Sequence, residues 1–197
     1  QGANPGILNA QETTIVHGAK VYANSLAGDA GRRIVWSDGI TKCDGDLCAS
    51  ALGDTGNGGF IEVSGLTGVS LSSHPDLRAR GGKAGELLLD PGSITIQDGA
   101  NVAPPASLAT VNDAWIQDQL QNFSSLSLST ANATNGAAET LTVNGNVSIT
   151  WSSANNLTLI GRRNIVYNSG AVINATGSGG IIMTGGQASP IAGNYNG

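Results

Sequence analysis

The stretch Gly58-Gly59-Phe60-Ile61-Glu62-Val63-Ser64-Gly65 decides the fold class of this chain. It consists of a glycine turn, a short run rich in apolar and β-branched residues, and a second turn. The same unit occurs earlier as Gly31-Arg32-Arg33-Ile34-Val35-Trp36-Ser37-Asp38-Gly39 and later as Gly85-Glu86-Leu87-Leu88-Leu89-Asp90-Pro91. A unit that recurs roughly every 27 residues, with no helix-length apolar pattern between its copies, is typical of a stacked β-repeat. The sequence therefore predicts a solenoid, which builds long surfaces more often than small pockets.

The second half of the chain returns to this pattern. Short apolar runs such as Leu126-Ser127-Leu128 and Leu157-Thr158-Leu159-Ile160 alternate with turns rich in Gly, Asn and Ser. Short strands of this kind, three to a turn, predict an all-β protein with a parallel β-helix. Antiparallel hairpins share this strand spacing, so a β-sandwich is the alternative fold.

The break between the two halves predicts one helix. Pro104-Pro105 cannot lie inside a central strand. Within 107–121 the apolar residues recur at helical spacing, and they are Leu108, Val111, Trp115, Ile116 and Leu120. We predict a short helix near 107–121 that packs on the side of the solenoid. The expected organisation is β-helix turns over 1–99, a loop and the helix over 100–124, and further turns over 125–197, in a fragment of a longer protein.

The composition excludes several classes of protein. With 40% hydrophobic and 12% charged residues in 197, the chain is too apolar for disorder and too poor in charge for a helical domain. The net charge of -5 argues against nucleic acid and against an anionic membrane surface as partners. No apolar run approaches the about 18 residues of a membrane span, so membrane insertion is not expected.

Two cysteines, Cys43 and Cys48, lie close together in the sequence. Their short spacing, with Gly45 between them, predicts a local disulfide that closes a surface loop in an oxidising compartment. Free thiols are the alternative, because two thiols without a nearby His or third Cys cannot complete a tetrahedral metal site. The loop that they close is a candidate contact loop. It consists of Asp44, Gly45, Asp46 and Leu47.

Four stretches carry a family resemblance when they are taken in order. They are Arg33-Ile34-Val35-Trp36-Ser37-Asp38-Gly39, the run from Gly56 to Gly65, the run from Gly85 to Ile96, and the run from Leu141 to Ser153. Together they resemble a block of the filamentous-haemagglutinin-like exoproteins, large adhesins that Gram-negative bacteria export by two-partner secretion. The resemblance covers roughly 19–186. Asn4-Pro5-Gly6-Ile7 matches the secretion-domain motifs only in part, so we place the chain downstream of that domain.

The resemblance implies a right-handed parallel β-helix, and it implies a function as well. It implies a secreted or cell-surface protein, exported through an outer-membrane transporter partner, that acts in attachment, biofilm formation and virulence. The expected partner is a glycan or protein of a host surface or matrix. Some members of the family instead capture haem-carrier proteins, and a module of that kind is an alternative function. Some members are also glycosylated at Asn-x-Ser/Thr sequons, which occur here at Asn122, Asn132, Asn146, Asn156 and Asn174.

No catalytic site is predicted from the residues. A β-helix polysaccharide lyase or hydrolase, the enzymatic alternative, needs carboxylates that converge on one face. The candidates do not recur at the repeat period, and they are Asp44, Asp46, Asp54, Glu62, Asp90, Asp98, Asp113 and Asp118. Glu62 alternates with apolar neighbours and is expected to face outward. His17 and His74 are far apart and are interpreted as ordinary surface residues. We therefore expect no enzymatic activity, no cofactor and no bound metal.

Two further patterns leave alternatives open. Most of the positive charge lies in Arg32-Arg33, in 78–83 and in Arg162-Arg163. These groups could form one stripe for an acidic glycan, or they could be solvated strand ends. Trp36 and Trp151 occupy similar places in their strands and could stack on sugar rings or belong to the core.

Overall fold

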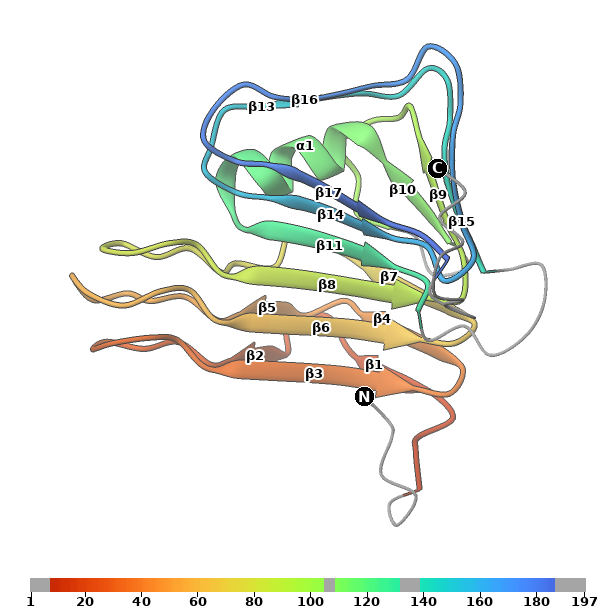
Figure 1. Cartoon of the computed structure of the whole chain (residues 1–197). Helices are drawn as coiled ribbons and strands as arrows, with labels where there is room; N and C mark the ends of the chain where they lie inside the picture. The colour runs from red at the N-terminus through yellow and green to blue at the C-terminus, as the bar shows by residue number, and fades with distance from the viewer. Residues whose placement is uncertain (1–7, 105–108, 132–138, 187–197) are drawn as a thin grey trace.

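The protein, described here by a computed structural model over residues 8–104, 109–131 and 139–186, is a parallel β-helix of about six turns (Figure 1). Its largest sheet contains six parallel strands in the order β17-β14-β11-β8-β6-β3. Their bounds are β3 (Arg32–Ser37), β6 (Phe60–Gly65), β8 (Glu86–Pro91), β11 (Ser125–Ser129), β14 (Leu157–Ile160) and β17 (Ile181–Thr184). The predicted fold class, an all-β right-handed parallel β-helix with one short helix, is confirmed.

Two further sides complete the turns. The strands of the second side are β1 (Thr13–Ile15), β4 (Ile40–Cys43), β7 (Gly68–Leu71), β9 (Ile94–Gln97), β10 (Thr110–Asn112), β12 (Thr140–Val143) and β15 (Asn164–Tyr167). Those of the third side are β2 (Lys20–Tyr22), β5 (Asp46–Cys48), β13 (Ser148–Trp151) and β16 (Val172–Ala175). The strand pairs of all three sides are parallel, so corresponding strands of successive turns lie one over another, and β10 adds to the edge of β9 that is opposite β12.

The core consists of ladders of aliphatic side chains along the axis of the solenoid. One ladder in the six-stranded sheet joins Ile61, Leu87, Leu126 and Leu157 in direct register. All four side chains are completely buried. Alternate residues of each strand face inward, so a second ladder of Val and Leu lies two residues further along these strands. Each turn thus buries its apolar face against the next, as a solenoid requires.

Three connections leave the solenoid and form the stacked arms, which project beyond the strands on the left of Figure 1. They comprise residues 23–31, 49–59 and 77–85. Each arm is closed at its base by a hydrogen bond from a glycine amide, for example from Gly59 N to Ala49 O at 2.8 Å. Parallel bridges join neighbouring arms, from Ser25 to Ala51 and from Ala51 to Ala79. The arms therefore continue the stacking of the turns outside the core.

The helix occupies the second part of the predicted segment 107–121. Helix α1 spans Asp113–Asn122, whereas Thr110–Asn112 forms β10 and pairs in parallel with β9. The helical spacing of Val111 was misleading, because this residue is buried as the central residue of a strand. Pro105 and Leu108 lie outside the described residues. The prediction of one short helix near 107–121 is confirmed, and the residues just before its N-cap Asn112 belong to a strand.

Helix α1 takes the place of a strand on the third side of the solenoid, next to β13 (Figure 1). Its side chains Asp113, Gln117 and Gln121 accept hydrogen bonds at 2.9 Å from the backbone N–H groups of Ser148, Thr150 and Ser152, respectively. Four residues of helix rise about 6.0 Å and two residues of strand rise about 6.6 Å, so the two spacings match. A row of helical side chains thereby pairs with the strand edge above it, which explains how a helix fits into the stack.

This match predicts the effect of changes at Gln117. Gln117→Leu keeps the size of the side chain but removes the acceptor of the Thr150 N–H, so we expect a loss of about 1 kcal/mol of unfolding free energy. Gln117→Glu keeps an acceptor oxygen at this position and is the matched control. Urea unfolding at neutral pH measures both variants. Equal stabilities of the two variants would show that this bond contributes nothing.

The two cysteines do not form the predicted disulfide; both thiols are free. Cys43 is the last residue of β4 and is buried, in register with Ile15 of β1 and Leu71 of β7. In β5 the buried residue is Leu47, so Cys48, the next residue along the strand, lies on the opposite face. The thiols therefore point in different directions, one into the core and one away from it, and cannot bridge without rearrangement of the backbone.

Free thiols of this kind have a predictable reactivity. Burial raises the pKa of Cys43 to about 12, and burial together with the carboxylates of Asp76 and Asp46 raises the pKa of Cys48. Because the thiolate is the reactive form, we expect a thiol reagent at neutral pH to modify Cys48 slowly and Cys43 only after unfolding. Mass spectrometry of the labelled protein distinguishes the two. A reducing agent should leave the thermal midpoint unchanged, and a lower midpoint would reveal a disulfide.

Candidate functional site

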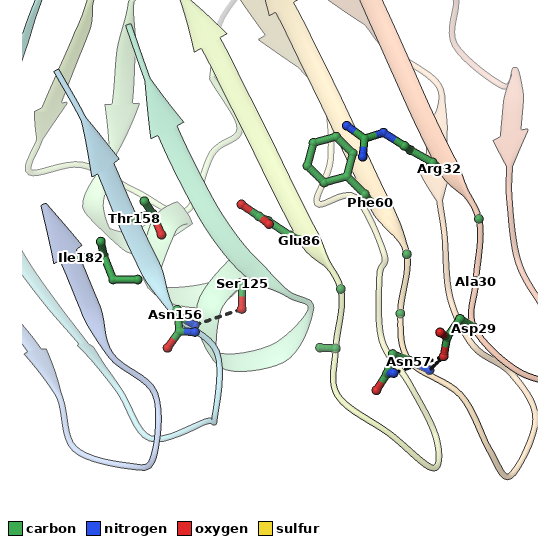
Figure 2. A pocket seen from close by; sticks show the side chains of 15 residues that line it. Asp29, Ala30, Arg32, Asn57, Phe60, Glu86, Ser125, Asn156, Thr158 and Ile182 are labelled. Atoms are coloured by element: carbon green, nitrogen blue, oxygen red, sulfur yellow. Dashed lines mark hydrogen bonds between the residues drawn. The ribbon is translucent and has the colours of Figure 1, made fainter. Parts of the chain in front are cut away.

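An open groove of about 730 Å³ lies on the six-stranded sheet (Figure 2). It lies where the stacked arms join the strands, and it extends from β3 across β6 and β8 to β17. Its labelled lining residues are Asp29, Ala30, Arg32, Asn57, Phe60, Glu86, Ser125, Asn156, Thr158 and Ile182. Glycines of the three arms supply the rest of the lining together with Ala84. Because every turn of the sheet contributes, the groove follows the axis of the solenoid.

The charged groups of the groove are engaged with their neighbours. The Arg32 guanidinium lies 4.1 Å from the centre of the Phe60 ring, a cation–π contact between successive turns. Glu86 accepts a short hydrogen bond from the Ser127 hydroxyl. Asp29 accepts hydrogen bonds from the backbone N and the side-chain amide of Asn57, at 2.7 and 3.1 Å. The groove thus presents amides, hydroxyls, two carboxylates and one cation along its length.

A second hollow of about 710 Å³ lies between the third arm, the end of α1 and the turn 152–156. Arg78 and Lys83 are its charged residues, and no carboxylate lines it. Side chains of the lower arms accept hydrogen bonds from backbone amides of the arm above: Asp29 accepts from Asn57 N, and Asn57 accepts from Lys83 N at 3.0 Å. Lys83 stands at the upper end of this series. A lysine at this position leaves the upper edge of the arms charged, as exposed edges of β structures commonly are.

The basic groups do not gather into one stripe. Arg32 lies in the groove, whereas Arg78 makes a two-bond ion pair with Asp76, at 2.9 and 2.6 Å. Arg162 and Arg163 both contact the buried carboxylate of Glu139.

The Asp76 pair predicts how stability depends on pH. Burial alone would raise the pKa of Asp76, but the hydrogen bonds from Arg78 and Ser50 outweigh it and hold this pKa below its usual value. The stabilisation is therefore complete above the unfolded pKa of about 3.9 and is lost as the pH falls through the lower folded value. We expect Asp76→Asn to reduce stability at neutral pH and to flatten its decline in acid. Urea midpoints between neutral pH and about pH 3 test this, and an unchanged slope would contradict it.

The predicted contact loop has a different shape from that expected. Asp44 and Asp46 are exposed, but Gly45 and Leu47 are buried, so the segment is a tight corner and does not project. A Cβ atom on Gly45 would lie 2.5 Å from the carbonyl oxygen of Ala19 in the turn below. Only the two carboxylates are available for a contact, and the role of this corner in binding stays a prediction.

Among the other predicted carboxylates and histidines, Asp118 and His74 meet, with Asp118 Oδ2 3.1 Å from His74 Nε2. Within the described ranges, no three or more His, Cys, Asp or Glu side chains are placed to hold a metal ion. Glu62 lies on the outer face of β6 but is buried, with Oε1 accepting from the Ser64 hydroxyl at 3.0 Å. The side chain of Asp113, the first residue of α1, accepts hydrogen bonds from the backbone amides of Gly99, Ala114 and Ser148. The interpretation of His74 as an ordinary surface residue is wrong, because its side chain is only 16% exposed and stacks between two aromatic rings.

Trp151 and Trp36 have different environments. Trp151 is a core residue whose indole N–H donates to Asn155 O at 2.7 Å. Trp36 is half-buried on the outer face of β3, in register with Ser64 of β6.

Four of the five sequons lie in the described residues, and Asn132 lies outside them. Asn122, Asn146, Asn156 and Asn174 are all exposed. Asn156 Oδ1 accepts from the Gly180 amide at 2.7 Å, so a glycan there would compete with a bond between turns. Glycosylation stays a prediction for all five.

Some important residues carried no signal in the sequence taken residue by residue. Gln117, Gln119 and Gln121 are central to the packing of α1. For Gln117 and Gln121, the available sign was an acceptor at every fourth position counted from Asp113. No helix in the described part of the chain has the length and apolar character needed to cross a membrane.

The chain matches no protein-family model and no curated protein.

Proposed function

We propose that this chain is a structural and adhesive segment of a secreted bacterial surface adhesin of the filamentous-haemagglutinin-like kind. The rigid β-helix extends and displays a surface, and it catalyses no reaction. The partner is a glycan or protein of a host surface or matrix, and the full-length protein leaves the cell through an outer-membrane transporter. The sequence resemblance supports this family, and the β-helix fold is compatible with such a role.

The groove across the six-stranded sheet is the observation that carries the proposal. It crosses several turns, it is open to solvent, and it presents hydroxyl and amide groups together with the Arg32–Phe60 pair. Groups of this kind make many weak hydrogen bonds to a polyhydroxylated chain or to an extended polypeptide. Such contacts become strong when many copies act together on one surface.

The test uses the chain displayed in many copies on beads, applied to panels of glycans and host-surface proteins. We expect binding to at least one partner, with a loss of about tenfold or more in avidity for Arg32→Glu, which reverses the only cation of the groove. Asp46→Ala, in the corner between β4 and β5, is the matched surface control. A partner lost with Asp46→Ala and kept with Arg32→Glu would move the site to that corner. Release of products from any polysaccharide would contradict the non-enzymatic assignment.

A further inference from the structure

His74 is the middle ring of a three-ring stack. It lies in the connection between β7 and β8, and its ring centroid is 4.9 Å from Trp115 of α1 and 4.9 Å from Phe123, just after α1. The planes differ by 7° and 5°, so both neighbours stack face to face on the imidazole. The side chain is thereby held between two residues that belong to the helix and its end.

The Nδ1 atom of His74 faces an oxygen that can only accept. This oxygen is Oε1 of the buried Gln119, at 2.8 Å. The orientation of the Gln119 amide is fixed, because its Nε2 donates to the Pro75 carbonyl at 3.0 Å and to the Ser124 hydroxyl at 2.8 Å. A flipped amide would place its oxygen against the Pro75 carbonyl. Nδ1 must therefore carry a proton.

The Nε2 atom also faces acceptors. It lies 3.0 Å from Oδ1 of Asn101 and 3.1 Å from Oδ2 of Asp118. The Asn101 amide is fixed in its turn, because its Nδ2 donates to Asp118 at 2.9 Å. Nε2 must therefore carry a proton as well, since an unprotonated nitrogen would direct its lone pair at a carboxylate.

We infer that His74 is held as an imidazolium, and that its positive charge locks α1 into the solenoid, so that the docking of α1 responds to pH. The charged groups near the ring are few. Helix α1 contributes Asp118, the 98–104 segment contributes the neutral Asn101, and the start of the third arm contributes Asp76 and Arg78. These last two pair with each other. The Arg78 guanidinium lies 5.6 Å from the centre of the Phe123 ring, which itself stacks on His74.

The charge of Asp118 supports this arrangement. Burial would raise the pKa of Asp118, but hydrogen bonds from Asn101 and Asn122 and the neighbouring positive ring lower it overall. Asp118 therefore stays ionised at neutral pH. Loss of the Nε2 proton would leave a neutral ring against this carboxylate and would weaken the cation–π contacts with Trp115 and Phe123.

The consequence reaches β13 through α1. The backbone N–H groups of Ser148, Thr150 and Ser152 are bonded to α1 side chains, so they exchange with solvent when the helix moves away. Their hydrogen exchange reports on the docking of α1 separately from global unfolding. The ladder of the six-stranded sheet, for example at Leu87, is the internal reference.

The test is NMR of the ¹⁵N-labelled full chain. We expect both ring nitrogens of His74 to carry protons while α1 is docked. We also expect the protection of these three amides, corrected for intrinsic exchange, to fall about tenfold or more over the pH interval in which the ring loses its second proton, while Leu87 stays protected. A neutral His74 tautomer in the protein with α1 docked, or amides whose protection does not follow the ring, would overturn the inference.

Two variants separate the lock from a general effect of histidine. The chain has two histidines, so His17→Gln is the matched control and should keep the pH response. His74→Gln cannot carry the charge, so the same three amides should be poorly protected at every pH and should show no pH response. A pH response that survives in His74→Gln would reject the role of this ring, and the NMR of the unmodified chain decides the question if that variant fails to fold.

Discussion

Leu87→Ala should destabilise the protein by about 3 kcal/mol, because it removes a completely buried side chain from the middle of the longest core ladder. Leu87 lies between Ile61 of the turn below and Leu126 of the turn above. These neighbours are fixed by backbone bonds to β8, so they cannot close the cavity. Both the lost burial and the remaining cavity therefore contribute.

Leu88→Ala is the matched control for this prediction. Leu88 has the same side chain one position further along β8, but it lies on the outer face and is only half-buried. We expect it to cost about 1 kcal/mol or less, since little apolar area is removed from water there. Urea unfolding of both variants gives the two values. Equal losses would mean that the alternation along β8 is not what holds the solenoid together.

The strands were predictable because burial alternates along them with a period of two. In β9, for instance, Ile94 and Ile96 are buried and the two polar residues between and after them are not, as the sequence indicates. Repetition of the unit then fixed the class of fold, because one such strand cannot bury its apolar face alone.

Features that depend on the register between turns could not be predicted in this way. Whether Cys43 and Cys48 face each other depends on which strand residues point inward, and their separation in sequence gives no information on that. Val111 has the spacing of a helix, but its segment pairs with β9. The tertiary context decided between two local structures that the sequence allows.

The surroundings of His74 were missed for a related reason. Its partners Asn101, Trp115, Gln119 and Asp118 come from segments that lie far along the chain. They meet only because α1 crosses the third side of the solenoid. A single histidine without a motif is no signal, and contact with a helix that replaces a strand has no signature in one sequence.

Gly59→Ala should be strongly destabilising, with a loss of about 3 kcal/mol or more of unfolding free energy. A Cβ atom at this position would lie 1.9 Å from the carbonyl oxygen of Gly31 in the arm below. That carbonyl accepts the amide of Phe60 at 3.1 Å, so it cannot move aside without breaking the bond between turns. The glycine is required here by the close approach of two backbones.

The same spacing applies one turn higher, which makes the effect general for the arms. A Cβ atom on Gly85 would lie 2.0 Å from the Gly59 carbonyl, which accepts the amide of Glu86 at 3.0 Å. Gly185→Ala is the control, because its Cβ would lie 3.9 Å from its nearest neighbours, Arg163 O and Ile165 N, which is ordinary contact. We expect that variant to unfold within about 0.5 kcal/mol of the unmodified chain. If Gly59→Ala is too unstable for urea titration, limited proteolysis should show early cleavage within 49–59. Resistance there equal to that of Gly185→Ala would show that the arms can separate without loss, and their tight stacking would then not support the groove beside them.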